Sequence, residues 1–367
     1  MESSIKRIGK SALSVILLAA IVFAAIVEFL TLTEFRPEES ETIAVGPVSG
    51  NAVQQGDTLR IMTWNCGYGA LGDNADFFMD GGKGVYTADR ERVESNLGQI
   101  SAQIARLSPD IVLLQEVDRD SSRSRHIDEV ISIYNDLWDV YELDYTIAFA
   151  YNLIVQFLPY PIPPIGKVQS GILTLAVPGA SSAERVQLPC SFKWPVRLAN
   201  FKRCLLIERF PIKNSDKELV LINLHLDAYD DGEGKKAQTD ALMEVLNDAA
   251  VREEIGDGNY VIAGGDFNQS FDGEGTSRYP LQEGVWAPGE LSTQQFGEEW
   301  QFLMDSDVPT CRSLDKPYAG ADHDSFQYYV VDGFIVSSNI EVRSCKTQDL
   351  GFVCSDHNPV LLECILK

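Results

Sequence analysis

The residues best suited to chemistry are Asp266 and Asn268, which follow the apolar run 260–263 and two glycines. An apolar run of that length, closed by glycines, predicts a buried strand with an exposed C-terminal end. Side chains alternate along an extended backbone, so Asp266 and Asn268 would point the same way while Phe267 faces the core. A carboxylate beside an amide can orient a nucleophilic water and hold a developing oxyanion. The alternative for this fragment alone is a strand end followed by an Asx turn.

Several other apolar runs also become polar only at their ends. We expect strands over 59–66, 110–118, 219–226 and 328–336, and each carries an acidic, amide or imidazole side chain near the point where it leaves the core. One such ending is ordinary, but seven on otherwise apolar strands predict that the ends converge on one polar site. The residues concerned, besides Asp266 and Asn268, are Asn65, Glu116, His225, Asp332, and Asp356 with His357.

The elements that must position these residues are many short strands and a few helices. Apolar residues recur every three or four positions in 89–107, and 126–143 and 235–250 also look helical, whereas 271–299 is rich in Gly, Pro and Glu and predicts a long loop. Too few helices are present for a parallel sheet. We therefore predict an α/β fold of two packed mixed β-sheets with helices outside. The remaining expected strands are 145–149, 169–177, 205–210 and 360–363.

An apolar segment rich in proline occupies 151–168, with four prolines inside 159–164. Proline lacks a backbone N–H and fixes φ, so regular structure is not expected through 159–164. One interpretation is an extended strand followed by a rigid loop that covers the core. The other is an apolar rim that contacts lipid or the tail of a substrate.

The N-terminal region predicts a membrane anchor. Residues 11–32 are almost wholly apolar and would span ~33 Å as a helix, enough for a bilayer core. Lys and Arg precede this run and Glu follows it, so residues 1–10 are expected in the cytoplasm and the body outside, as a single-pass protein. A cleaved signal peptide is the alternative. Residues 33–57, rich in Glu, Pro, Ser, Gly and Gln, predict a tether to a folded domain at 58–367.

The net charge of −24 restricts the class of substrate. An acidic body is poorly suited to binding nucleic acid, because Lys and Arg supply most of that affinity. The charge does not exclude a small phosphorylated substrate whose site is neutralised by divalent cations.

Seven cysteines show no CxxC or zinc-like spacing, so a structural metal site is not expected. An odd number leaves one unpaired in the monomer that we expect. Outside the cytoplasm some could pair, and Cys345 with Cys354 is a plausible disulfide.

Six short motifs, in order along 58–367, resemble those of the endonuclease/exonuclease/phosphatase superfamily. The resemblance implies a four-layered α/β sandwich and Mg²⁺-dependent cleavage of phosphate esters, with Mn²⁺ as the alternative ion. The motifs are Thr63-Trp64-Asn65, Leu114-Gln115-Glu116, Asn223-Leu224-His225-Leu226, Gly265-Asp266-Phe267-Asn268, Val331-Asp332-Gly333-Phe334 and Ser355-Asp356-His357-Asn358-Pro359.

The resemblance also implies the metal ligands. Glu116 looks like the principal Mg²⁺ ligand, since a hard cation takes oxygen donors. Asn65 is similar to the family residue that supports the same site, and Asp356 is a further candidate ligand.

The remaining motif residues are candidates for proton transfer and charge stabilisation. His357 is the candidate acid/base, because only histidine titrates near neutral pH without perturbation. Asp332 resembles the carboxylate that orients this histidine. Asp266 would position or activate the attacking water, while His225 and Asn268 would donate hydrogen bonds to the phosphoryl oxygens. We expect no covalent intermediate, because no Ser or Cys is expected beside the His–Asp pair.

The Asn-x-His-Leu form of the third motif is more like that of sphingomyelinases, pancreatic-type deoxyribonucleases and phosphatases than that of abasic-site endonucleases. The expected anchor, the acidic body and the apolar segment favour a small or lipid phosphodiester as substrate. The leading hypothesis is a membrane-tethered, Mg²⁺-dependent phosphodiesterase or phosphatase, sphingomyelinase-like in substrate. The alternatives are a nuclease outside the cytoplasm and a catalytically inactive binding module on the same fold.

Overall fold

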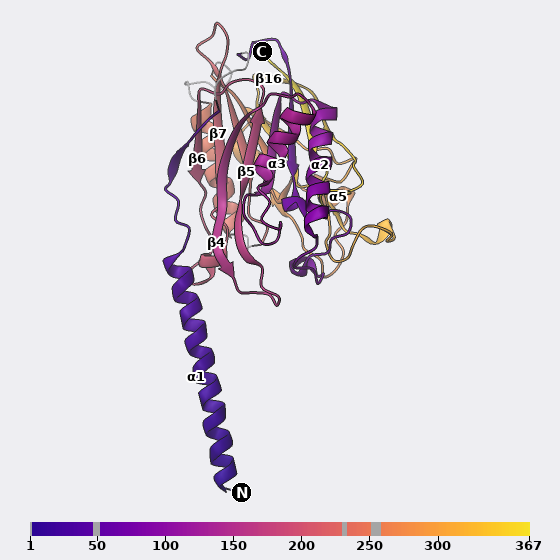
Figure 1. Ribbon diagram of the computed structural model, residues 1–367. Coiled ribbons are helices and arrows are strands. Elements are labelled where there is room, and N and C mark those ends of the chain that lie inside the picture. The colour runs from indigo at the N-terminus through magenta and orange to yellow at the C-terminus, as the bar shows by residue number, and fades with distance from the viewer. Residues whose placement is uncertain (1, 47–51, 230–232, 251–257) are drawn as a thin grey trace.

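A long helix leaves a body of two packed sheets in the computed structural model (Figure 1), which describes residues 2–46, 52–229, 233–250 and 258–367. The helix is α1 (Glu2–Leu32). Its segment Ser11–Leu32 is the one helix of the described residues that is long and apolar enough to cross a membrane, judged by length and composition.

The body is built on one sheet of seven strands and one of six, each with parallel and antiparallel pairs. The seven-stranded sheet has the order β1 (Ser40–Ile43), β6 (Ser182–Gln187), β7 (Cys204–Pro211), β8 (Glu218–His225), β9 (Tyr260–Asp266), β15 (Asp332–Ser337) and β12 (Trp300–Leu303). The six-stranded sheet has the order β16 (Ile340–Thr347), β17 (Val360–Leu366), β2 (Thr58–Asn65), β3 (Ile111–Asp118), β5 (Gly166–Ala176) and β4 (Thr146–Leu158).

The central strands are covered on both faces. Because side chains alternate along a strand, these strands are therefore apolar at successive positions. In β2, Ile61 points into the core between the sheets, whereas Met62 and Trp64 point to the outer core on the other side. The outer face of the six-stranded sheet is covered by α2 (Arg90–Leu107) and α3 (Glu129–Asn135), and that of the seven-stranded sheet by α4 (Glu233–Ala249). These four layers confirm the predicted fold class.

The helices largely follow the sequence pattern. Asp89 caps α2 by accepting a hydrogen bond from the Arg92 backbone N–H at 2.8 Å, and Ser108 ends the helix in the left-handed conformation. The helix expected over 126–143 is shorter: α3 begins after Asp128 and continues only through a π-helical turn, Asp136–Val140.

Two stretches differ from the prediction, and a third follows one of its two interpretations. Part of the expected tether forms the edge strand β1, which pairs with β6; residues 47–51 of that tether lie outside the described residues. Strand β4 continues past Phe149 to Leu158 by pairing with β5, which agrees with the interpretation of 151–168 as an extended strand followed by a loop. The expected loop 271–299 contains short elements: β10 (Gln269–Phe271), α5 (Glu274–Arg278), β11 (Gly289–Leu291) and the 3₁₀ turn Thr293–Phe296.

The strand expected over 328–336 is two strands in different sheets. Its first residues form β14 (Tyr328–Tyr329), which pairs with β13 (Cys311–Arg312), and its last form β15. The break at residues 330–331 lets Asp332 begin β15 at the end of the sandwich where other strands end.

All seven cysteines are free, so the plausible disulfide is wrong. Cys354 lies in the core beneath α2, while Cys345 packs against the core between the sheets. Two side chains on opposite faces of a sheet cannot meet without displacing it.

Candidate active site

The polar residues predicted at strand ends do meet at one end of the sandwich. In the parallel pair β8–β9, His225 is the register partner of Asp266, and in the antiparallel pair β9–β15, Asp266 is the partner of Asp332. Three neighbouring strands therefore place an imidazole and two carboxylates in one row. In the facing sheet, β2 ends at Asn65 and β3 carries Glu116 near its own end.

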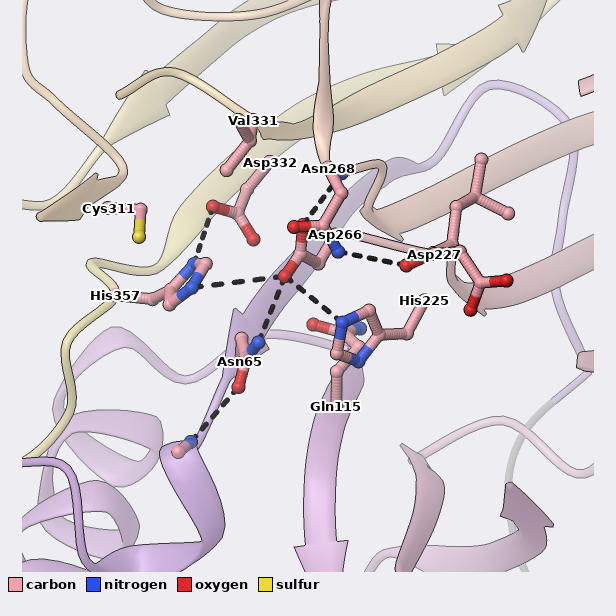
Figure 2. Close-up of polar contacts among 12 residues, drawn as sticks. Asn65, Gln115, His225, Asp227, Asp266, Asn268, Cys311, Val331, Asp332 and His357 are labelled. Atoms are coloured by element: carbon pink, nitrogen blue, oxygen red, sulfur yellow. Dashed lines mark hydrogen bonds and ion pairs between the residues drawn. The ribbon is translucent and has the colours of Figure 1, made fainter. Parts of the chain in front are cut away.

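The Asp266 carboxylate is the centre of this cluster (Figure 2). Its Oδ2 accepts a hydrogen bond from Asn65 Nδ2 at 3.0 Å and lies 3.4 Å from His225 Nε2 and 3.8 Å from His357 Nε2. Its Oδ1 accepts from the Asn268 backbone N–H at 2.9 Å. Asp266 is buried together with all of these partners.

Two glycines before Asp266 allow the strand to pack this closely. A Cβ on Gly264 would lie 2.5 Å from the Phe334 ring, and one on Gly265 would lie 1.9 Å from the Leu224 carbonyl oxygen. Glycine is required at both positions because any side chain would separate β9 from its neighbours and move the Asp266 carboxylate.

His357 is held from three sides. Its Nδ1 lies 2.8 Å from Asp332 Oδ2, its backbone carbonyl accepts from the Trp64 indole N–H at 2.9 Å, and its backbone N–H donates to Ser355 Oγ. Ser355 Oγ also donates to the Asn65 carbonyl at 2.7 Å, which attaches the loop to the end of β2. The imidazole orientation is thus fixed before any substrate arrives.

Burial and neighbouring charges shift the pKa values of His357 and Asp266. Burial alone would lower the pKa of His357, but the charge and hydrogen bonding of Asp332 and Cys311 together outweigh it and raise that pKa well above 6.5. Burial, assisted by Asp332, raises the pKa of Asp266 to about 7, while His357 opposes the increase. At neutral pH the site therefore holds an imidazolium beside a carboxylate that can still accept a proton.

His225 and Asn268 complete the row in different ways. Burial lowers the pKa of His225 well below 6.5, so this imidazole is neutral, and its Nδ1 has no hydrogen-bond partner in the described part of the chain. Asn268 has a left-handed backbone (φ 50°) and donates from Nδ2 to the Leu226 carbonyl at 2.8 Å. One amide N–H of Asn268 is thereby used to join two loops, and the other remains for a ligand.

Glu116 reaches the site through an irregularity in β3. The pairing of β3 with β5 shifts register between Leu114 and Val117, and Glu116 adopts φ 52° within this bulge. The next residues are fixed: Glu129 Oε2 accepts the Asp118 backbone N–H at 2.8 Å, and Arg123 donates twice to the Asp118 carboxylate at 2.9 Å. A bulge re-aims a side chain, and here it turns the half-buried Glu116 carboxylate away from the regular ladder.

The oxygen donors near Glu116 fit a hard divalent cation. Burial raises the pKa of Asp356 to about 6; the charge of His357 opposes this increase and the negative charge of Glu116 adds to it. Asn65 Oδ1 accepts the Gly67 backbone N–H at 3.0 Å and keeps a second lone pair. Two carboxylates and an amide oxygen form the donor set that Mg²⁺ prefers, and a cation would relieve the repulsion.

Among the described residues, two groups of side chains have metal-ligand atoms within 4.8 Å of one another, and both include His357: one with Asp266 and Asp332, the other with Cys311 and Asp356. In the first group, His357 Nδ1 is already engaged by Asp332, which leaves Nε2 as the ring nitrogen open to a ligand or a proton acceptor. The presence of Cys311 corrects the expectation that no cysteine lies beside the His–Asp pair (Figure 2). Burial raises the pKa of the Cys311 thiol to about 12, so it is not a thiolate nucleophile at neutral pH.

Sequence reasoning missed the residues that border the site from loops. Tyr229 donates to Asp80 Oδ1 at 2.5 Å, and its ring packs edge-on against Trp286. Glu116 contributes to raised pKa values at both Asp80 and Tyr229, after the larger effect of burial. No periodic pattern marks loop residues 149 positions apart, and nothing in the sequence joins them.

Below the site, Gln115 donates to Asn223 Oδ1 at 2.9 Å and connects the two sheets. This contact could have been found, because both residues interrupt apolar strands and both lie in the motifs.

Comparisons with known proteins identify the fold and the family. The sequence profile described as "Endonuclease/Exonuclease/phosphatase family" matches residues 62–357. No curated protein matches the chain. Among solved structures, an endonuclease/exonuclease/phosphatase from Beutenbergia cavernae DSM 12333 is 18% identical with a TM-score of 0.55, over 84% of this chain and 72% of that one.

An endonuclease/exonuclease/phosphatase family protein from Leptotrichia buccalis C-1013-b is 14% identical with a TM-score of 0.54, over 83% of this chain and 99% of that one. TDP2 from C. elegans is also 14% identical, with a TM-score of 0.50, over 85% of this chain and 76% of that one. At such identities the solved structures show a common fold, and the profile match shows the family. The chain belongs to the endonuclease/exonuclease/phosphatase family, whose members are hydrolases acting on phosphate ester bonds.

Proposed function

We propose that this protein is a membrane-anchored, Mg²⁺-dependent phosphoesterase that hydrolyses a phosphodiester or phosphomonoester by attack of water, with a sphingomyelinase-like phospholipid as the favoured substrate. The observation that carries the proposal is the Asp266 cluster. It joins a carboxylate whose pKa is about 7 to an imidazolium held by Asp332. A base that can accept a proton near neutral pH beside an acid that still holds its own suits hydrolysis of a phosphate ester.

The residues divide the work as follows. Asp266 orients the attacking water and accepts its proton. His357 carries a proton on Nε2, the ring nitrogen turned away from Asp332, and gives it to the ester oxygen that leaves as its bond to phosphorus breaks. His225 and the free N–H of Asn268 donate to the phosphoryl oxygens as negative charge develops. Asp332 keeps the His357 imidazole oriented and protonated.

Glu116, Asn65 and Asp356 are the residues that would hold Mg²⁺, which when bound neutralises the phosphate and stabilises the leaving oxygen. Mn²⁺ satisfies the same oxygen donors and is the alternative ion. The metal ligands come from the six-stranded sheet and its loops, whereas Asp266 and His225 come from the other sheet. A phosphate between the sheets would meet both sets.

A lipid substrate is favoured by features outside the site. The α1 segment Ser11–Leu32 would anchor the chain as a single pass, with the catalytic domain outside the cytoplasm. The net charge of −24 disfavours a polyanion such as DNA. We therefore place nuclease activity second, and we expect a monomer.

The full chain, reconstituted in vesicles, should be assayed with Mg²⁺ against vesicle sphingomyelin and against supercoiled plasmid. The proposal predicts release of the phosphorylated headgroup, abolished by EDTA and restored by Mg²⁺. The matched control is His126→Ala, an exposed histidine paired with Asp120 at 2.6 Å, which should leave the rate unchanged. Plasmid nicking without lipid hydrolysis would refute the lipid substrate and favour the nuclease. Turnover of no phosphate ester would favour a binding module.

A further inference from the structure

The active-site end of the sandwich is also the end where the β4–β5 hairpin turns. Strand β5 runs antiparallel to β3, with Ser170 opposite Asp118, so its first residue Gly166 lies beyond the site end of β3. Gly166 pairs with Leu158, the last residue of β4. The hairpin tip, residues 159–165, therefore projects past the end of the sheet that carries Glu116.

The helix α1 joins the body at this same end. Ser40, the first residue of β1, is opposite Val186 near the end of β6. The next residue of β6, Gln187, is opposite Cys204 at the start of β7. The start of β7 lies beside the end of β8, which carries His225. Figure 1 shows the β4–β5 hairpin and α1 leaving the body on the same side.

The outer end of α1 is packed against the body and does not swing free. Leu30 is buried in an apolar cluster with Leu153, Val155, Val168 and Leu198, and Ile26 and Val27 pack against that cluster. Because Ile26 lies six residues before Leu32, the body follows the apolar helix for ~9 Å below its outer end. Domain side chains therefore lie at the depth of the apolar span.

Polar contacts fix the same junction. The Trp194 indole N–H donates to Thr31 Oγ1 at 3.2 Å, and Glu34 lies 3.1 Å from Arg197 and 3.8 Å from Lys202. The Glu34 side chain is almost fully buried and Lys202 is nearly so, whereas the Arg197 side chain is 45% exposed. The orientation of the body relative to α1 is thus set by both apolar and ionic contacts.

Large apolar side chains surround this junction and face outward. Ile162 is 93% exposed, Tyr160 71% and Trp194 55%, and Phe157 and Val196 are also exposed. We name these five residues the membrane face. Lys193 and Arg197 flank Trp194 and Val196 in sequence, and aromatic residues beside cations are typical of the boundary between lipid and water.

We propose that the membrane face inserts into the headgroup region of the bilayer that α1 spans, so that the active site takes its phosphate ester from the adjoining leaflet of that membrane. The proposal rests on the anchoring role given to α1 under the proposed function. A lipid surface is the expected partner of the membrane face because its exposed residues continue directly from the apolar helix. It also names the substrate class: an amphiphile with its phosphate at the membrane surface.

The first test measures contact with lipid independently of catalysis. The full chain carrying Ile162→Trp is reconstituted into phosphatidylcholine vesicles with or without bromine on the acyl chains near the headgroup. The proposal predicts that bromine removes most of the added tryptophan emission. The matched control is Val177→Trp, which follows the opposite end of β5 and is 41% exposed, and its added emission should be retained. Equal, weak quenching at both positions would overturn the proposal.

The second test links docking to turnover. The double variant Tyr160→Ser/Ile162→Ser should lower hydrolysis of a vesicle-embedded phosphodiester by about 10-fold, because two apolar side chains no longer enter the lipid. Hydrolysis of a soluble diester, bis(p-nitrophenyl) phosphate, should not change. Equal rates of vesicle hydrolysis for the variant and the parent would overturn the proposal.

The two tests also separate this proposal from the proposed function. Quenching at Ile162→Trp without hydrolysis of any lipid would support docking and refute the lipid substrate. Hydrolysis of vesicle lipid without quenching would support the substrate and overturn docking. A dimer that dissociates in the double variant, with no quenching, would show that a second copy covers the membrane face, which also overturns docking.

Discussion

Replacing Asp332 by asparagine tests the link between buried charge and catalysis. The side chain keeps its shape, so the contact with His357 Nδ1 at 2.8 Å can persist through the amide oxygen. The negative charge is lost from a position where both residues are buried. The raised pKa of His357 should therefore fall, and so should the raised pKa of Asp266, since Asp332 contributes to both.

The magnitude follows from the hydrogen bond that loses its charge. A hydrogen bond to a charged group contributes ~1.5–3 kcal/mol, which corresponds to about 1–2 pKa units and to about 10- to 150-fold in kcat/KM. In the parent, activity should rise as Asp266 loses its proton, with a midpoint at about 7, and fall at higher pH as His357 loses its own. Both limbs should move to lower pH in Asp332→Asn.

The assay is the pH profile of kcat/KM on bis(p-nitrophenyl) phosphate with saturating Mg²⁺. Asp110→Asn is the matched control, because this carboxylate accepts the Arg60 backbone N–H at 2.8 Å at the opposite end of β3. It should retain the parent rate and profile. An unchanged rate and profile in Asp332→Asn would refute the role of the pair, and a lower rate with an unchanged pH optimum would reduce Asp332 to a structural residue.

Three further substitutions have separate readouts. Burial raises the pKa of Glu208 from 4.5 to about 7, so the native state retains a proton that the unfolded chain loses, and stability should fall as pH rises from 4.5 to 7. Glu208→Gln should remove this pH dependence of stability and raise the free energy of unfolding at pH 8 by up to ~3 kcal/mol. Chemical denaturation in detergent measures both quantities. A variant whose stability depends on pH as the parent's does would contradict the account. Gly265→Ala should lower the melting temperature and the activity together, because its Cβ would lie 1.9 Å from the Leu224 carbonyl oxygen, and a variant with parental stability would show that β9 can move. Trp64→Phe removes the hydrogen bond to the His357 carbonyl and should lower kcat by about 10-fold at nearly unchanged KM, whereas a change in KM alone would contradict a positioning role.

The parts of the fold that could be predicted are those where local pattern and tertiary role agree. The apolar run before Asp266 forms β9 as expected, because it is buried on both faces and its glycines permit close packing. The regular spacing of apolar residues likewise located α2.

Elements that depend on a distant partner could not be predicted. The strand β1 has alternating exposed and half-buried residues and depends on β6 for its pairing, so its composition alone resembles a tether. An extended strand is one of two interpretations of residues 151–168, and it is the pairing of β4 with β5 up to Leu158 that supports it. The short strands β13 and β14 have only two residues each and leave no periodic signal.

The same distinction applies to the site. Asp266 and His225 could be placed together because strand ends meet at one end of a sheet, whereas Asp332, in the middle of the expected strand 328–336, reaches the same row only because the chain breaks at 330–331. The bulge that turns Glu116, and the Asp118, Arg123 and Glu129 contacts that hold it, arise from packing that no residue pattern records. The neighbouring thiol of Cys311 arrives from a separate two-stranded sheet.

The central claim is that one end of the sandwich is a metal-dependent phosphoesterase site, and turnover by two variants tests it most directly. Hydrolysis of the best phosphate ester with Mg²⁺ should be measured for Glu116→Ala, which removes the proposed main metal ligand, and for His357→Ala, which removes the proposed acid. Each variant should lose most of its turnover while folding like the parent, and His126→Ala should lose none. Full activity in both Glu116→Ala and His357→Ala would contradict the site assignment.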